Sequence, residues 1–149
     1  MNRFADNLAL LLVTAWVGGL WAIGYLAAPV LFHTLDDRAL AGMLAGKMFG
    51  WIATLGMFCG FYLLIHRLAN YGTPALKQGF FWVVFAMLLL TLAGHFGIQP
   101  ILAQIKAQAG AVDVMQSVFA DRFSTWHGVA SIGYLMESVL GVALVLRAK

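Results

Sequence analysis

Four long apolar stretches alternate with short polar segments along this chain. The first, residues 8–32, is a run of 25 positions without Asp, Glu, Lys, Arg or His. A helix needs about 20 mainly apolar residues to cross the hydrocarbon core of a bilayer. Three more stretches of helix length follow, at about 42–65, 80–102 and 126–146. The pattern predicts four transmembrane helices.

The same pattern predicts helices rather than strands. Only helices and closed barrels satisfy the backbone polar groups inside lipid, and the sequence lacks the two-residue alternation of membrane strands. The composition agrees, because 62% of the residues are hydrophobic and 10% are charged, against roughly 25% charged in soluble domains. We therefore expect an all-α membrane protein in which residues 1–149 form a single four-transmembrane-helix bundle in the lipid bilayer.

The basic residues indicate how the helices are oriented. Five of the nine lie at the end that holds both termini, namely Arg3, Arg67, Lys77, Arg147 and Lys149, and four lie at the other end, namely Arg38, Lys47, Lys106 and Arg122. Because Lys and Arg near the helix ends favour the inside, both termini are predicted to be cytoplasmic. The basic residues are scattered and form no patch, which excludes a nucleic-acid partner.

Small residues recur in the second stretch at four-residue steps. Gly42, Gly46 and Gly50 form one ridge, and Gly56 and Gly60 repeat the spacing. Lipid gives no hydrophobic drive for helix association, so small residues allow the close contact that holds membrane helices together. The ridge predicts tight packing against a neighbour, which is either another helix of the chain or a second copy in a homo-oligomer.

The aromatic and sulfur-bearing side chains have ordinary explanations in a membrane. The five tryptophans mostly lie near predicted helix ends and are interpreted as interfacial anchors: Trp16, Trp21, Trp51, Trp82 and Trp126. The seven methionines are interpreted as gap fillers. The single cysteine, Cys59, excludes an intrachain disulfide.

Three of the four histidines gather on the outer side of the membrane in this topology. His33 follows the first helix, His95 lies in the outer half of the third, and His127 opens the fourth. Gln99 is one turn from His95, and a polar stripe continues from His127 along one face of its helix through Ser131, Tyr134 and Ser138. Polar stripes in lipid should face the bundle interior. The two faces are therefore expected to form one pocket open to the outer side.

Three chemistries fit such a pocket. Imidazoles from neighbouring helices bind a haem iron or a copper ion. We take His127 and His95 as the expected metal ligands, surrounded by the cofactor contacts His33, Gln99, Ser131 and Tyr134. A line of His, Glu and Tyr groups could instead relay protons. Alternatively, the polar groups only hold the helices in register, as in a non-catalytic scaffold or assembly protein.

Glu137 is the most costly residue to place in lipid. It lies about 16 Å into the fourth helix, where an ionised carboxylate is expensive. One hypothesis makes it the proton site of a small transporter that works as an oligomer, because four helices are few for a transporter. The other is a protonated Glu137 hydrogen-bonded to Ser138 or to a residue of the second helix such as Thr54. The sequence has no phosphate loop, paired catalytic acids or nucleophile motif, so it assigns no catalytic residue.

Four segments resemble a known family. They read AWVGGLW at 15–21, APVLF at 28–32, AGMLAGKMF at 41–49 and FSTWHGVAS at 123–131. Together they resemble a bacterial domain of unknown function related to the eukaryotic transmembrane protein 205. The resemblance covers nearly the whole chain and implies a multi-pass helical protein of the bacterial inner (cytoplasmic) membrane. The eukaryotic members are linked to resistance to platinum drugs.

A more distant resemblance is to the copper-resistance CopD-like membrane proteins and the haem-pathway protoporphyrinogen oxidase HemJ. These proteins also combine a first helix of the Trp-Val-Gly-Gly type with membrane histidines. The HemJ-like group binds haem through a histidine of its first helix, whereas this chain has no histidine before His33. This departure from the pattern argues against enzymatic haem chemistry. What carries over from the resemblance is His127, within its motif, as a contact for haem or copper.

Overall fold

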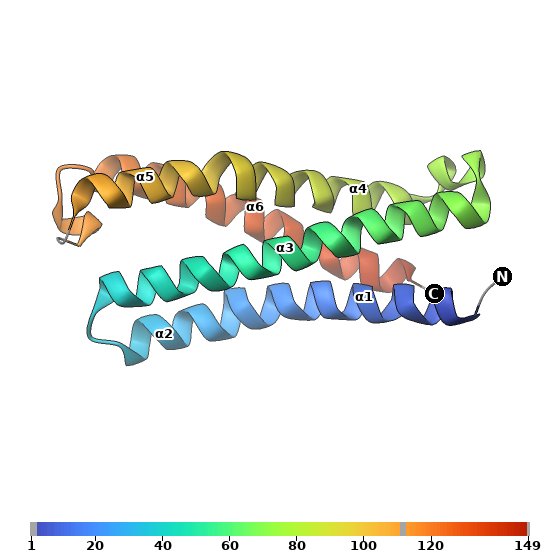
Figure 1. Ribbon diagram of the computed structural model, residues 1–149, viewed down its shortest axis with the longest axis horizontal. Coiled ribbons are helices and arrows are strands. Elements are labelled where there is room, and N and C mark those ends of the chain that lie inside the picture. Colours follow the sequence, from blue (N-terminus) through green and yellow to red (C-terminus); the bar gives the residue numbers. More distant parts are fainter. Residues whose placement is uncertain (1–2, 111–112, 149) are drawn as a thin grey trace.

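The computed structural model describes residues 3–110 and 113–148. These residues form four long helical spans and no β-strand (Figure 1). The spans are Arg3–Thr34, Arg38–Tyr71, Gly79–Ala109 and Ala120–Arg147, and each is long and apolar enough to cross a membrane. The predicted all-α fold with four helices long and apolar enough to cross a membrane is confirmed.

Each span is longer than the apolar stretch that predicted it. The first begins at Arg3 rather than near residue 8, and the second ends at Tyr71 rather than near residue 65. Polar residues continue the helices beyond the hydrocarbon layer, because water and lipid headgroups solvate them there. Lys149, one of the five basic residues used to predict the orientation, lies outside the described residues.

The first and third spans are each interrupted by a π-helical segment. Span one consists of α1 (Arg3–Trp21), η1 (Ala22–Ala27) and α2 (Ala28–Thr34), and span three of α4 (Gly79–Leu92), η3 (Ala93–Ile98) and α5 (Gln99–Ala109). Span two is α3 (Arg38–Tyr71), and span four is α6 (Ala120–Arg147). Two short 3-10 turns, η2 (Thr73–Lys77) and η4 (Val114–Gln116), lie in the connections.

A proline explains the position of each π segment. Pro29 and Pro100 lie in the first turn of α2 and α5. A proline inside a continuous helix has no N–H, and its ring clashes with the carbonyl four residues back. The backbone widens just before each proline, where the preceding amide donates to a carbonyl five residues back, that of Ile23 in span one and of Gly94 in span three. The same device therefore occurs once in each half of the chain.

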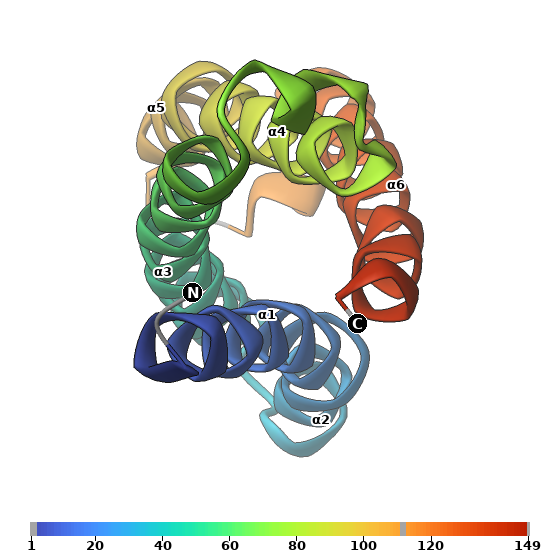
Figure 2. The same ribbon diagram turned by 90° about the vertical axis from the view of Figure 1, so that its right-hand side faces the viewer.

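The four spans form a bundle in which consecutive spans are neighbours. Figure 2 shows α1, α3, α4 and α6 in order around a ring, which closes where α6 packs against α1. Both termini lie at one end of the bundle, which we call the terminal end (Figure 1). Towards the opposite end, α2 packs on α3 and α5 packs on α6. Each hairpin is thus packed mainly within itself at the opposite end.

Large apolar side chains fill the half of the bundle that is nearer the terminal end. This core consists of Val13, Trp16, Val17, Leu20, Ile52, Cys59, Leu63, Phe80, Val84, Met87, Leu88 and Leu144. Beyond it, the buried apolar residues in the described part of the opposite half include three alanines: Ala28, Ala41 and Ala45, with Leu102 and Ile105. The bundle is tightly filled near the termini and has smaller contacts at the opposite end.

Two glycines of α3 allow Trp16 to lie inside this core. A Cβ atom at Gly56 would overlap the indole of Trp16, and one at Gly60 would crowd both Trp16 and Leu88. Trp16 is 0% exposed, so its interpretation as an interfacial anchor is wrong. The close approach of α1 and α3 at Gly56 is the physical reason. Trp51, in contrast, is 76% exposed.

The ridge of Gly42, Gly46 and Gly50, nearer the opposite end, makes few close contacts within the described chain. A Cβ atom at Gly42 would lie near Lys106 and Phe32 of the same chain, whereas one at Gly46 or Gly50 would meet no described atom within 4 Å. The homo-oligomer predicted from this ridge stays a prediction.

Candidate functional site

The buried polar side chains of the bundle lie where α6 packs on α4. Glu137 and Ser138 of α6 are 6% and 3% exposed, and Thr91 of α4 is 4% exposed. A carboxyl group buried within a membrane span is costly unless it is hydrogen-bonded. The partners of Glu137 therefore decide what this group can do.

The hydroxyl of Thr91 holds the Glu137 carboxyl. Thr91 Oγ1 lies 2.6 Å from Glu137 Oε1 and 2.9 Å from the carbonyl oxygen of Met87. A hydroxyl carries one hydrogen and rotates to suit its surroundings. When it donates to Met87, the short contact with Glu137 requires a proton on the carboxyl group. When it donates to Glu137, it stabilises the carboxylate, so this arrangement accommodates both protonation states.

The partners that the sequence predicted for Glu137 are engaged elsewhere. Ser138 Oγ donates to the carbonyl of Tyr134 at 2.8 Å, and Thr54 Oγ1 donates to that of Gly50 at 3.0 Å. Both bonds run four residues back within one helix, as is common for Ser and Thr. The prediction of Ser138 or Thr54 as the partner is therefore wrong. The packing of α4 on α6 brings a residue of the third span there instead.

The indole of Trp16 is a second neighbour of the Glu137 carboxyl. Its Nε1 is buried and makes no hydrogen bond to any described residue. A buried N–H without an acceptor is costly, and the neighbouring Glu137 carboxyl is a group that can accept from it. Glu137, Thr91 and Trp16 thus form a polar site built from three spans, which we call the Glu137 site.

Helix α6 is also bonded to residues that precede the first π segment. Tyr134 Oη donates to the carbonyl of Leu20 at 2.5 Å, and Trp21 Nε1 donates to the carbonyl of Ser138 at 3.4 Å. Leu20 and Trp21 come directly before η1, much as Thr91 comes just before η3. Because π segments within helices occur frequently at functional sites, the polar face of α6 connects the Glu137 site to both irregular segments.

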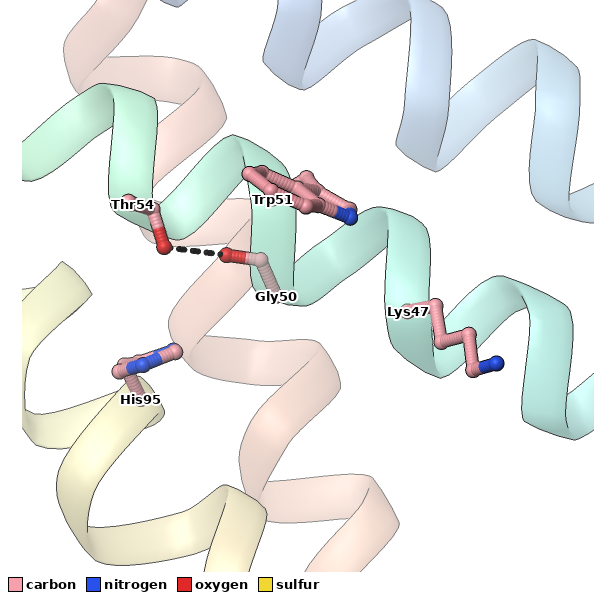
Figure 3. Close-up of a pocket in the computed structure, with 5 residues that line it drawn as sticks. All are labelled: Lys47, Gly50, Trp51, Thr54 and His95. Atoms are coloured by element: carbon pink, nitrogen blue, oxygen red, sulfur yellow. Dashed lines mark hydrogen bonds between the residues drawn. The ribbon is translucent and has the colours of Figure 1, made fainter.

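His95 lies one turn beyond Thr91 and borders an open groove of about 230 Å³. The groove, which we call the His95 groove, is lined by Lys47, Gly50, Trp51, Thr54 and His95. Figure 3 shows the imidazole facing the turn of α3 that contains Gly50 and Thr54, with Lys47 further along the helix. Nδ1 of His95 is buried and makes no hydrogen bond to any described residue.

His127 does not join this groove. It is exposed and stacks on Phe123 with 5.6 Å between the ring centroids, and its carbonyl accepts a hydrogen bond from the exposed Ser131. In the described part of the chain, no hydrogen bond or ring contact joins His127 to His95, and no three His, Cys, Asp or Glu side chains are grouped to hold a metal ion. The assignment of this pair as metal ligands stays a prediction.

The other predicted contacts of the pocket are also dispersed. His33 is exposed near the end of α2, and Gln99 is half-buried at the start of α5. Neither lines the His95 groove. Tyr134 does reach the interior, through its bond to the carbonyl of Leu20.

Two residues of the Glu137 site were missed by the reasoning from sequence. Thr91 lies inside an apolar stretch, but it precedes His95 by four residues and so shares its helix face. That spacing was a usable signal. Trp16 gave no such signal, because its burial depends on Gly56 in another span.

A known family model matches most of the chain. Residues 11–111 match a domain of unknown function, DUF4149. The match includes the segments at 15–21, 28–32 and 41–49 and the residues of the His95 groove, whereas Glu137 lies beyond it. No curated protein and no solved structure matches the chain. Since the matched residues make up more than half of the chain, the protein belongs to the DUF4149 family.

Proposed function

We propose that this protein is a proton-binding protein of the bacterial inner membrane, with both termini in the cytoplasm, and that Glu137 takes up and releases a proton during the transport of a small solute. The observation that carries the proposal is the position of the Thr91 hydroxyl between the Glu137 carboxyl and the Met87 carbonyl. It supports both protonation states of a side chain that is 6% exposed. Acids within membrane spans mark proton or ion pathways by default.

A route between Glu137 and the surface runs along the third span. Thr91 and His95 are four residues apart, so their side chains are neighbours on one helix face. His95 borders the open groove, and imidazoles are common members of proton relays. In the proposed orientation the groove opens in the outer half of the membrane, so protons enter from the outer side.

Infrared difference spectroscopy of the purified protein during a pH titration tests this proposal directly. The wild-type protein is expected to show a carboxyl band that disappears as pH rises, and Glu137→Gln is expected to remove that band. Thr91→Ser keeps the hydroxyl and should keep the band. Thr91→Val removes the hydroxyl and should shift the band while lowering stability by about 1–3 kcal/mol.

Correct folding of each variant is checked by gel filtration and thermal unfolding. A titration in which the same carboxyl bands appear in the wild-type protein and in Glu137→Gln contradicts the proposal. In vesicles with a trapped pH-sensitive dye, Glu137→Gln should also abolish solute-dependent proton movement.

A second candidate function is haem binding at the His95 groove. The favourable observation is the imidazole of His95, which borders an open groove. A haem bound there would project beyond the groove, whose volume is about 230 Å³, and the buried Nδ1 would not be the ligand atom. One imidazole supplies one axial ligand of a haem iron. A copper site needs several donors, and the described residues offer no group of three.

Absorption spectroscopy separates this candidate from the first. Protein titrated with hemin should develop a Soret band that His95→Ala removes and His127→Ala leaves in place. A protein that takes up neither hemin nor copper, measured by elemental analysis, contradicts metal handling. If Glu137 is also silent in the infrared titration, a scaffold or assembly role remains.

A further inference from the structure

We infer that the His95 groove binds a small organic acid in its anionic form, and that Lys47 recognises the charge. Such an acid would be the solute whose transport is coupled to the proton on Glu137, and this part rests on the proposed function. Binding of the acid to the groove can be tested by itself.

Lys47 supplies the formal charge of the groove wall. The other lining residues are Gly50, Trp51, Thr54 and His95, so no carboxylate lines the groove. Within the described residues, Lys47 makes no hydrogen bond or ion pair. A cationic side chain within a membrane span normally pairs with a counter-charge or faces a hydrated cavity. A bound carboxylate would provide the missing partner.

The depth of Lys47 suits a ligand that enters from the headgroup side. Helix α3 has 34 residues and begins at Arg38, so it is about 51 Å long and exceeds a hydrocarbon layer of about 30 Å by roughly 10 Å at each end. Lys47 lies about 14 Å along this helix, only a few Å inside the layer. From there its ammonium can extend to the headgroup level, while the groove continues deeper towards His95.

The size and lining of the groove favour a compact molecule. Its volume of about 230 Å³ is below the roughly 300–1,000 Å³ of pockets for drug-sized ligands. Gly50 leaves the backbone of α3 accessible, since a Cβ atom there would meet no described atom within 4 Å. Trp51 adds an exposed aromatic surface, and His95 adds a hydrogen-bonding group at the deep end. A small aromatic carboxylate combines these requirements.

Binding of benzoate to the purified full chain in a neutral detergent tests the inference. Isothermal titration calorimetry should show saturable binding of benzoate, and binding about tenfold weaker for its neutral isostere benzamide, because one charge-assisted contact is lost. Lys47→Gln should weaken benzoate about tenfold and leave benzamide unchanged. Lys47→Arg should retain benzoate binding.

Two further variants locate the site. Gly50→Leu should fill the groove and abolish the binding of both compounds. Lys77→Gln is the matched control, because Lys77 ends the η2 turn at the terminal end of the bundle, and it should change neither affinity. Equal affinities for benzoate and benzamide, or equal losses in Lys47→Gln and Lys77→Gln, would overturn the inference.

Glu137→Gln separates this inference from the proposed function. Benzoate binding should persist in Glu137→Gln, because Glu137 does not line the groove. Absent benzoate binding with an intact infrared carboxyl signal would overturn the ligand inference alone. Intact benzoate binding without that signal would overturn the proton site alone.

Discussion

Glu137, Trp16 and Gly56 depend on one another across three helices. Gly56 leaves the space that the Trp16 indole occupies, and that indole is a neighbour of the Glu137 carboxyl. The carboxyl is also held by Thr91 of a fourth helix. A small change at the glycine should therefore disturb the polar site as well as the apolar core.

The substitution Gly56→Ala tests this dependence. The added methyl group would overlap the Trp16 side chain, and overpacking of a filled core costs about 1–3 kcal/mol. We expect a lower midpoint of thermal unfolding in detergent and a shifted tryptophan emission. Gly46→Ala is the control, because its Cβ would meet no described atom within 4 Å. If Gly56→Ala is as stable as Gly46→Ala, the tight contact between α1 and α3 is not as described.

At the scale of the elements, the π segments η1 and η3 decide which way the polar side chains of spans one and three point. Each additional residue in a helical turn rotates the following residues by about 100° relative to a regular α-helix. His95 lies within η3, so its position in the groove depends on this irregularity. Pro100 maintains η3, because it cannot donate the hydrogen bond of a regular turn.

We expect Pro100→Ala to stabilise the chain and to weaken ligand binding at the His95 groove. The alanine supplies the missing N–H and removes the ring clash, which in a helix interior costs about 3 kcal/mol. Thermal unfolding should therefore shift upwards, while benzoate calorimetry should show reduced affinity. Pro74→Ala, in the η2 turn outside the spans, should leave benzoate affinity unchanged. Unchanged affinity in Pro100→Ala would show that η3 does not position His95.

At the scale of the whole molecule, the two ends of the bundle are held together differently. The side-chain contacts that join neighbouring segments at the terminal end include those of Tyr62 with Ala5, of His66 with Asp6 and of Arg67 with Gln78. Near the opposite end, Lys106 of α5 donates to the carbonyl of Gly42 in α3 at 3.3 Å. This bond links two hairpins that otherwise pack mainly within themselves there.

Lys106→Met should loosen the opposite end without unfolding the bundle. The apolar stem is kept, while the bond to the Gly42 carbonyl and the contact of the ammonium with the Phe123 ring of α6, 5.6 Å away, are lost. The cost in global stability should therefore be about 1–2 kcal/mol. Hydrogen exchange measured by mass spectrometry should accelerate in α2, α5 and the first turns of α3, and stay unchanged in α1. Lys77→Met provides the comparison at the terminal end. Uniform acceleration along all spans would contradict a separately held opposite end.

The positions of the helices could be predicted, because they depend on the local sequence. The contacts between side chains of different helices could not, because they depend on how each helix is rotated. The four spans and the all-α class follow from apolar length, and the position of Glu137 within a span can be read from the sequence directly. The partner of Glu137 did not follow, because Thr91 is 46 residues away in sequence. The burial of Trp16 likewise required the glycine of a different span.

The sequence by itself determined that this chain has four helices long and apolar enough to cross a membrane and an acid within the fourth, since hydrophobic length and charge are properties of the chain at each position. Tertiary structure alone decided that Thr91 meets Glu137, that Trp16 is buried beside it, and that His95 faces a groove without His127. The reason is that contacts between helices in lipid depend on how closely the helices approach and on how each helix is rotated about its axis. Several glycines determine the close approach, and the two prolines determine the rotation through the π segments.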